Sequence, residues 1–73
     1  MQNYKSKAVQ YLWNNAETDK SKAELSLDLL LENGVGIGDH STGDFYYNLD
    51  EALDNLVDAL DRLEVLSKYY PRD

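Results

Sequence analysis

All four glycines of this chain lie in one short segment, residues 33–44, which reads N-G-V-G-I-G-D-H-S-T-G-D. The sequence on both sides of it repeats apolar residues at helical spacing. Gly34 follows Asn33 at the end of the first run, where a glycine adopts the left-handed helix cap at no steric cost. We therefore expect one long helix to end here, the chain to reverse, and a second to begin near Thr42 or Asp44.

The second helix is expected over about residues 44–69, where apolar residues recur every seven positions. One stripe is Leu49, Leu56, Leu63 and Tyr70, a second is Ala52, Ala59 and Leu66, and Leu53 and Leu60 widen the pattern by one position. A stripe this broad is typical of a helix in a bundle more than of a two-stranded zipper. Acidic residues occupy the opposite face: Asp50, Glu51, Asp54, Asp58, Asp61 and Glu64. Pro71 ends the helix.

The first helix is expected over about residues 3–33, either continuous or kinked near residues 14–20. Ser21 and Glu24 have the spacing of a capping box, which favours a new helix start. Against a break, one stripe runs through the whole segment: Val9, Leu12, Trp13, Ala16, Ala23, Leu27 and Leu30. A continuous helix also matches the length of its expected partner, so we favour it.

The expected fold is therefore all-α, a single long antiparallel helical hairpin with a glycine-rich loop at residues 34–43. Leucines near the end of the first helix point in nearly every direction: Leu25, Leu27, Leu29, Leu30 and Leu31. One partner helix cannot cover them all. A chain of 73 residues without cysteine also has no disulfide to stabilise it. We expect a homo-oligomeric helical bundle, a homodimer or a higher oligomer.

Charge and hydropathy narrow the partners and the compartment. The net charge of −7 argues against direct binding to nucleic acid or to an anionic membrane. No apolar run approaches the roughly 20 residues that span a bilayer. We expect a soluble, cytoplasmic protein that carries no cofactor. Residues 1–22 hold four lysines and two acids, whereas residues 44–69 hold seven acids and two bases, so a hairpin places a basic start beside an acidic helix.

The glycine-rich segment is also the candidate ligand site. Converging backbone N–H groups of glycines and the start of a helix can bind an anion. Flat tyrosine rings in the first turn of the second helix could stack on a base. The candidate residues are Gly34, Gly36, Ile37, Gly38, Asp39, His40, Ser41, Thr42, Tyr46 and Tyr47. The alternative is a plain connector in which Val35 and Ile37 close the end of the core.

The chain offers no set of residues for catalysis. His40 is the only histidine, and Asp39 and Asp44 are too few additional ligands to complete a metal site within one chain. Ser41 lies beside His40 but lacks a third group to orient the histidine. We expect neither an enzyme nor a metal protein.

The chain is also rich in aromatic residues for its length. Five of them should gather at the end where the termini meet, either as an interface or as ordinary packing: Tyr4, Tyr11, Trp13, Tyr69 and Tyr70.

The segment V-G-I-G-D-H at residues 35–40, followed by D-F and an acidic helix, resembles small helical accessory proteins of tailed phages. The resemblance covers residues 23–70, and its specific part is residues 35–40. It implies action on host defence or host enzymes in the host cytoplasm. Some such proteins are oligomers that sequester cyclic-nucleotide or ADP-ribose-type signals.

We therefore expect a non-enzymatic anti-defence protein that binds and sequesters a small nucleotide-derived signal at the glycine-rich loop. The alternatives are an acidic inhibitor or DNA mimic acting on a host protein through Asp50, Asp54, Asp58 and Asp61, and a structural oligomeric phage component.

Overall fold

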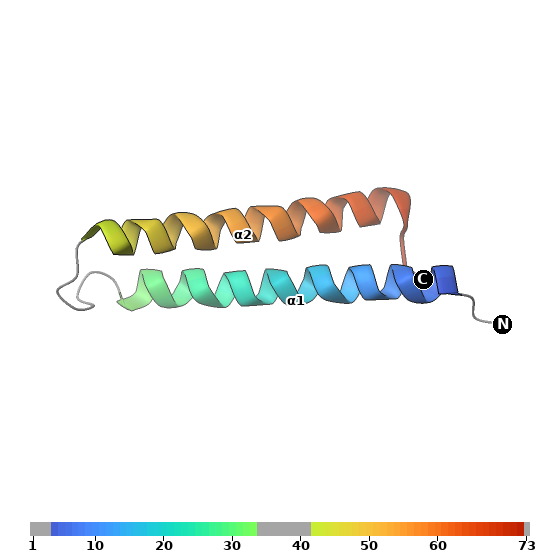
Figure 1. Cartoon of the computed structure of the whole chain (residues 1–73), viewed down its shortest axis with the longest axis horizontal. Helices are drawn as coiled ribbons and strands as arrows, with labels where there is room; N and C mark the ends of the chain where they lie inside the picture. Colours follow the sequence, from blue (N-terminus) through green and yellow to red (C-terminus); the bar gives the residue numbers. More distant parts are fainter. Residues whose placement is uncertain (1–3, 34–41, 73) are drawn as a thin grey trace.

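The computed structural model of the chain describes residues 4–33 and 42–72, and both segments are almost entirely helical. Helix α1 spans Tyr4–Asn33 and helix α2 spans Thr42–Tyr69. The helices lie side by side and antiparallel, so the start of α1 and the end of α2 share one end of the molecule (Figure 1). We call this the open end and the opposite one the connector end. The expected all-α hairpin is confirmed. Neither helix has a stretch long and apolar enough to cross a membrane within the described residues.

Helix α1 is a single helix, without the break that the capping-box sequence at Ser21 could have produced. Buried alanines on either side of that point, Ala16 and Ala23, pack on the same face. Tertiary packing of this face therefore overrides the weak local preference for a cap. Helix α2 begins at Thr42, slightly before Asp44.

The core of the hairpin is thin and made mostly of small residues. Six apolar residues are buried in the part of the chain that the structure describes: Trp13, Ala16, Ala23, Ala52, Ala59 and Leu66. Four of the six are alanines, and they lie seven residues apart on each helix. Because an alanine side chain ends at Cβ, the two backbones can approach closely along this seam.

Two contacts, one at the open end and one near the middle of the rod, fix the register between the helices. Trp13 is hydrogen-bonded to Tyr70, and Asp19 is hydrogen-bonded to Arg62. The residue numbers add to 83 in the first pair and to 81 in the second, so residues that face each other across the seam have numbers that add to about 82. Extrapolated along the seam, this register places Ala23 level with Ala59. The smallest side chains of the two helices therefore meet at mid-length.

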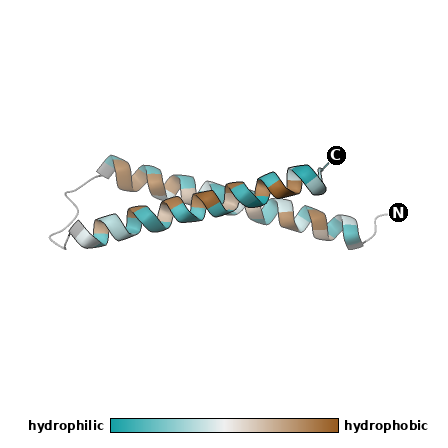
Figure 2. Cartoon of the chain, turned by 90° about the horizontal axis from the view of Figure 1, so that it is seen from above, coloured by the Kyte–Doolittle hydropathy of each residue, from teal (hydrophilic) through white to brown (hydrophobic). Residues whose placement is uncertain are grey.

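The hairpin is a slender rod in which the two helices cross at a shallow angle (Figure 2). It measures 57 × 18 × 15 Å, and its radius of gyration is 16.4 Å. A compact domain of this length has a radius of gyration of about 11 Å. The figure also shows apolar segments recurring along both helices, yet each helix has only one neighbour to cover them. Much apolar surface is consequently left in contact with solvent.

Candidate functional site

Most of the ligand-binding residues expected from the sequence lie outside the described part of the chain. These are Gly34, Gly36, Ile37, Gly38, Asp39, His40 and Ser41. Thr42 is the first residue of α2, and Tyr46 and Tyr47 follow in its first turns. The glycine-rich ligand site therefore remains a prediction, and only its tyrosines can be described.

Tyr46 and Tyr47 are both exposed, at 62% and 65% of their full accessible surface. The ring of Tyr46 packs against Phe45, with centroids 5.9 Å apart and planes tilted by 55°. Successive residues of a helix point about 100° apart, so one flat ligand could stack on either tyrosine but not on both. Asp44 lies in the first turn of α2. Its carboxylate stabilises the helix start and reduces the positive potential available to an anion there.

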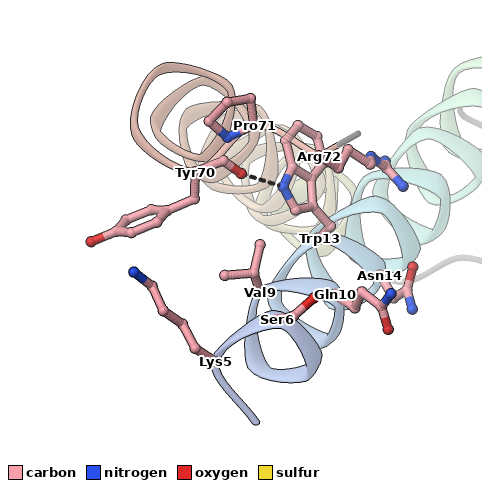
Figure 3. Close-up of a pocket in the computed structure, with 9 residues that line it drawn as sticks. All are labelled: Lys5, Ser6, Val9, Gln10, Trp13, Asn14, Tyr70, Pro71 and Arg72. Atoms are coloured by element: carbon pink, nitrogen blue, oxygen red, sulfur yellow. Dashed lines mark hydrogen bonds between the residues drawn. The ribbon is translucent and has the colours of Figure 1, made fainter. Parts of the chain in front are cut away.

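The open end contains the most elaborate set of side-chain contacts. Tyr70 follows the last residue of α2, so its carbonyl has no partner within the helix. The indole Nε1 of Trp13 donates a 2.9 Å hydrogen bond to that carbonyl (Figure 3). The guanidinium carbon of Arg72 lies 4.2 Å from the centroid of the Trp13 ring, and Arg72 also pairs with Glu17. These contacts hold residues 70–72 against α1.

A groove of about 660 Å³ lies beside this contact, between the first turns of α1 and the last residues of the chain. In Figure 3 the side chains of Lys5 and Tyr70 lie to the left of Val9, and Trp13 lies to its right. The groove is lined by both polar and apolar side chains: Lys5, Ser6, Val9, Gln10, Trp13, Asn14, Tyr70, Pro71 and Arg72.

The sequence predicted a gathering of aromatics at this end, and the structure brings together only part of that set. Trp13 contacts the backbone carbonyl of Tyr70, while the ring of Tyr70 points away from the indole (Figure 3). Tyr11 and Tyr69 are more than 60% exposed, and Lys68 lies 5.5 Å from the Tyr69 ring centroid. The structure does not describe the side chain of Tyr4. Sequence reasoning missed Arg72. Pro71 marks the end of the helix but does not indicate where the residue that follows it lies.

A second polar cluster lies midway along the rod. Arg62 on α2 donates a 2.9 Å hydrogen bond to Asp19 on α1 and pairs with Asp58 on its own helix at 3.2 Å. The hydrogen bond to Asp19 is the main cause that raises the pKa of Arg62 above its ordinary value, while partial desolvation lowers it. Both members of the Asp19 pair are about one-third exposed, so water and salt screen this interaction.

The cross-helix ion pairs run opposite to the expected direction. The sequence predicted lysines of the first helix beside acids of the second. The described pairs instead join acids of α1 to arginines of the C-terminal segment. Asp19 pairs with Arg62 on α2, and Glu17 pairs with Arg72 beyond the end of α2. Net charge per helix counts every residue, whereas only residues that flank the seam are close enough to pair.

One side of the hairpin is broadly apolar, and we call it the leucine face. Half-buried leucines lie beside the seam, and exposed apolar residues lie next to them on the same side of the hairpin. Its members are Leu27 and Leu31 on α1, and Tyr46, Leu49, Leu53, Leu56, Val57, Leu60 and Leu63 on α2. Helical geometry places them on one side because positions four apart point within about 40° of each other.

Charge divides the rod into two unlike halves. The open half, residues 4–22 and 59–72, holds all seven basic side chains and four acids, a net charge of +3. The connector half, residues 23–33 and 42–58, holds eight acids and no base, a net charge of −8. In the connector half Asp50, Glu51 and Asp54 are exposed. No group of three or more His, Asp or Glu side chains that could hold a metal occurs among the described residues.

Comparisons with known proteins give no further guide to this arrangement. No protein-family model matches the sequence. No curated protein and no solved structure is significantly similar to it either.

Proposed function

We propose that this chain is a non-enzymatic accessory protein that works as a homo-oligomeric helical bundle. The observation that carries the proposal is the imbalance of its apolar side chains. Six apolar residues are buried, four of them alanines, while thirteen large hydrophobic side chains are exposed, in the part of the chain that the structure describes. A seam this small offers too little burial to offset the conformational entropy lost by two long helices.

The shape of the molecule supports the same conclusion. The accessible surface of the hairpin is 5821 Å². A folded monomer of 8.4 kDa exposes about 4,600 Å² by the usual scaling of surface with mass. The excess lies on a rod whose leucine face is apolar along most of α2. Packing that face against a second copy would supply the missing core.

Two exposed leucines at the centre of the leucine face provide the test. The double substitution Leu53→Glu with Leu60→Glu places two charges on each copy of the face, so the oligomer should dissociate and lose thermal stability. Leu25→Glu is the matched control, because Leu25 is 60% exposed at the same level of the rod but points away from α2. The proposal predicts that L25E keeps the mass of the wild-type oligomer. Equal behaviour of the two variants would contradict it.

The role that we propose for the bundle is to sequester a small nucleotide-derived ligand at the connector end. The first turn of α2 has backbone N–H groups that lack a partner within the helix, and the exposed ring of Tyr47, which lies outside the leucine face, supplies a stacking surface. The connector half carries −8, so a phosphate there must be bound by backbone groups at close range. Thermal shift with cyclic dinucleotides and cyclic ADP-ribose isomers tests this role. A ligand at a hundredfold excess over its Kd adds about 2.7 kcal/mol of stability.

The charge of the connector half favours a second candidate role, binding to a basic host protein. Asp50 and Asp54 are exposed on α2 in the connector half, which holds no base, and Asp61 is exposed in the open half. Reversal of charge at Asp54 and Asp58 should abolish binding to such a protein and leave ligand binding intact. If no nucleotide raises the melting temperature while these reversals remove an inhibitory activity, the acidic role replaces the first.

A further inference from the structure

We infer that a second copy packs on the leucine face in the antiparallel direction, with the open half of each hairpin over the connector half of the other. The inference rests on the proposed self-association and adds its orientation. Three features of the described residues carry it: where the apolar face is centred, how large it is, and how charge is distributed along the rod.

Three of the four exposed residues of the leucine face on α2, all but Tyr46, are placed nearly symmetrically about their own midpoint. Leu53, Val57 and Leu60 are exposed to similar extents, between 44% and 49%. Val57 lies close to the point midway between the two leucines. A two-fold axis through this point would bring Leu53 of one copy level with Leu60 of the other. Such a contact uses the same patch on both copies and closes the assembly at a dimer.

The footprint of the face is large enough for a stable dimer. Helix α2 has 28 residues, and the rod is 18 Å wide. At 1.5 Å per residue α2 is about 42 Å long, so a contact along the whole helix and across the width of the rod covers about 750 Å² on each copy. A contact of this extent would bury about 1,500 Å² in total, within the range of stable interfaces. The contact would also cover the half-buried leucines beside the seam.

Charge selects the antiparallel direction over the parallel one. In a parallel dimer the two connector halves, each with −8, would lie side by side, as would the two open halves with +3. In the antiparallel dimer each −8 half lies beside a +3 half. Like charges held together are repelled, and unlike charges are attracted, within a Debye length of about 8 Å at physiological salt.

Distances between nitroxide labels on the full-length chain, measured by pulsed dipolar spectroscopy, distinguish the two directions. One variant carries the label at Lys7→Cys near the open end, and a second at Ser26→Cys near the level of Val57. Both positions are exposed, and neither belongs to the leucine face. The antiparallel dimer predicts a separation of about 50 Å or more for the Lys7 labels, from the helical rise. It predicts a separation of about 20–35 Å for the Ser26 labels, from the width of a four-helix bundle.

Each other outcome overturns a defined part of the account. Short distances for both labels would show a parallel dimer, and would overturn the orientation while leaving self-association intact. The absence of dipolar coupling for both labels, with wild-type helicity, would show a folded monomer and overturn the proposed function as well. A short Lys7 distance in a larger assembly would also overturn the antiparallel pairing.

Discussion

Asp19 on α1 accepts a 2.9 Å hydrogen bond from the guanidinium of Arg62 on α2, which joins the two helices near the middle of the rod. The Nε atom of the same guanidinium is buried and has no hydrogen-bond partner among the described residues. This pair and the Trp13–Tyr70 bond together set the register in which the alanines of the seam meet.

Arg62→Met and Asp19→Asn should each lower the free energy of unfolding, and the double variant should lose less than the sum of the two. A partner shared by two substitutions makes their effects non-additive. Urea denaturation at one protein concentration measures all three variants. Asp58→Asn is the control, because its carboxylate is 70% exposed and lies farther from Arg62, at 3.2 Å. Strict additivity of the Asp19 and Arg62 variants would contradict the pairing.

The contribution of Arg62 to stability should not change between about pH 7 and pH 10. Its pKa is raised above the ordinary value, mainly by the hydrogen bond to Asp19. A raised pKa of a base means that the stabilisation is fully present below the ordinary pKa and is lost only when the pH rises through the higher one. Wild type and R62M should therefore differ by the same amount at both ends of that range in urea denaturation. A difference that disappears by pH 10 would contradict this assignment.

Trp13→Phe should destabilise the hairpin by about 1–3 kcal/mol, because the carbonyl of Tyr70 then lacks its donor and the smaller ring leaves a gap. Denaturant unfolding followed by circular dichroism measures the loss. Tyr11→Phe is a matched control on the same helix, since the Tyr11 side chain is 63% exposed, and it should change stability by less than about 0.5 kcal/mol. Similar losses in both variants would show that the indole contact contributes nothing specific.

Arg72→Ala should cost about 0.5–1 kcal/mol, the usual value of a partly exposed cation–π contact together with a surface ion pair. The fluorescence of Trp13, the only tryptophan, should shift to longer wavelength as the indole face becomes exposed to water. Arg72→Lys keeps the charge but loses the planar group that stacks on the ring. We expect it to have an intermediate spectrum. An unchanged spectrum in R72A would place the arginine away from the indole in solution.

Ala59→Leu should destabilise the protein by about 1–3 kcal/mol, because it forces a larger side chain between closely packed helices. Ala59 has no exposed surface, and the register places it level with Ala23. Ala8→Leu is the control, since Ala8 is exposed on α1 and both residues are good helix formers. Thermal melts of both variants at equal concentration would test the seam. If A59L has a higher melting temperature than A8L, the seam has space for the larger side chain and is not closely packed.

The hairpin could be predicted from the sequence because its signals are local and repeated. Ala52 and Ala59 recur at the heptad spacing, Gly34 marks the end of one helix and Pro71 the end of the other. Each of these acts through backbone geometry or periodic burial, which one sequence reveals. The continuity of α1 through Ser21 needed the additional argument that both helices have similar length.

The contacts at the open end could be predicted from the sequence only in part. Arg72 follows the proline in a tail without periodicity, so nothing in its neighbourhood predicts that it stacks on Trp13. The direction of the ion pairs was wrong for a related reason, because Asp19 faces Arg62 only in one register of the seam. The predicted ligand contacts from Gly34 to Ser41 lie outside the described residues and stay predictions.

Sedimentation equilibrium of the full-length chain tests most directly whether the hairpin needs a second copy. The account predicts a mass of at least twice the 8.4 kDa of one chain, together with a melting temperature that rises with protein concentration. A fully helical species of 8.4 kDa whose melting temperature does not depend on concentration would contradict it.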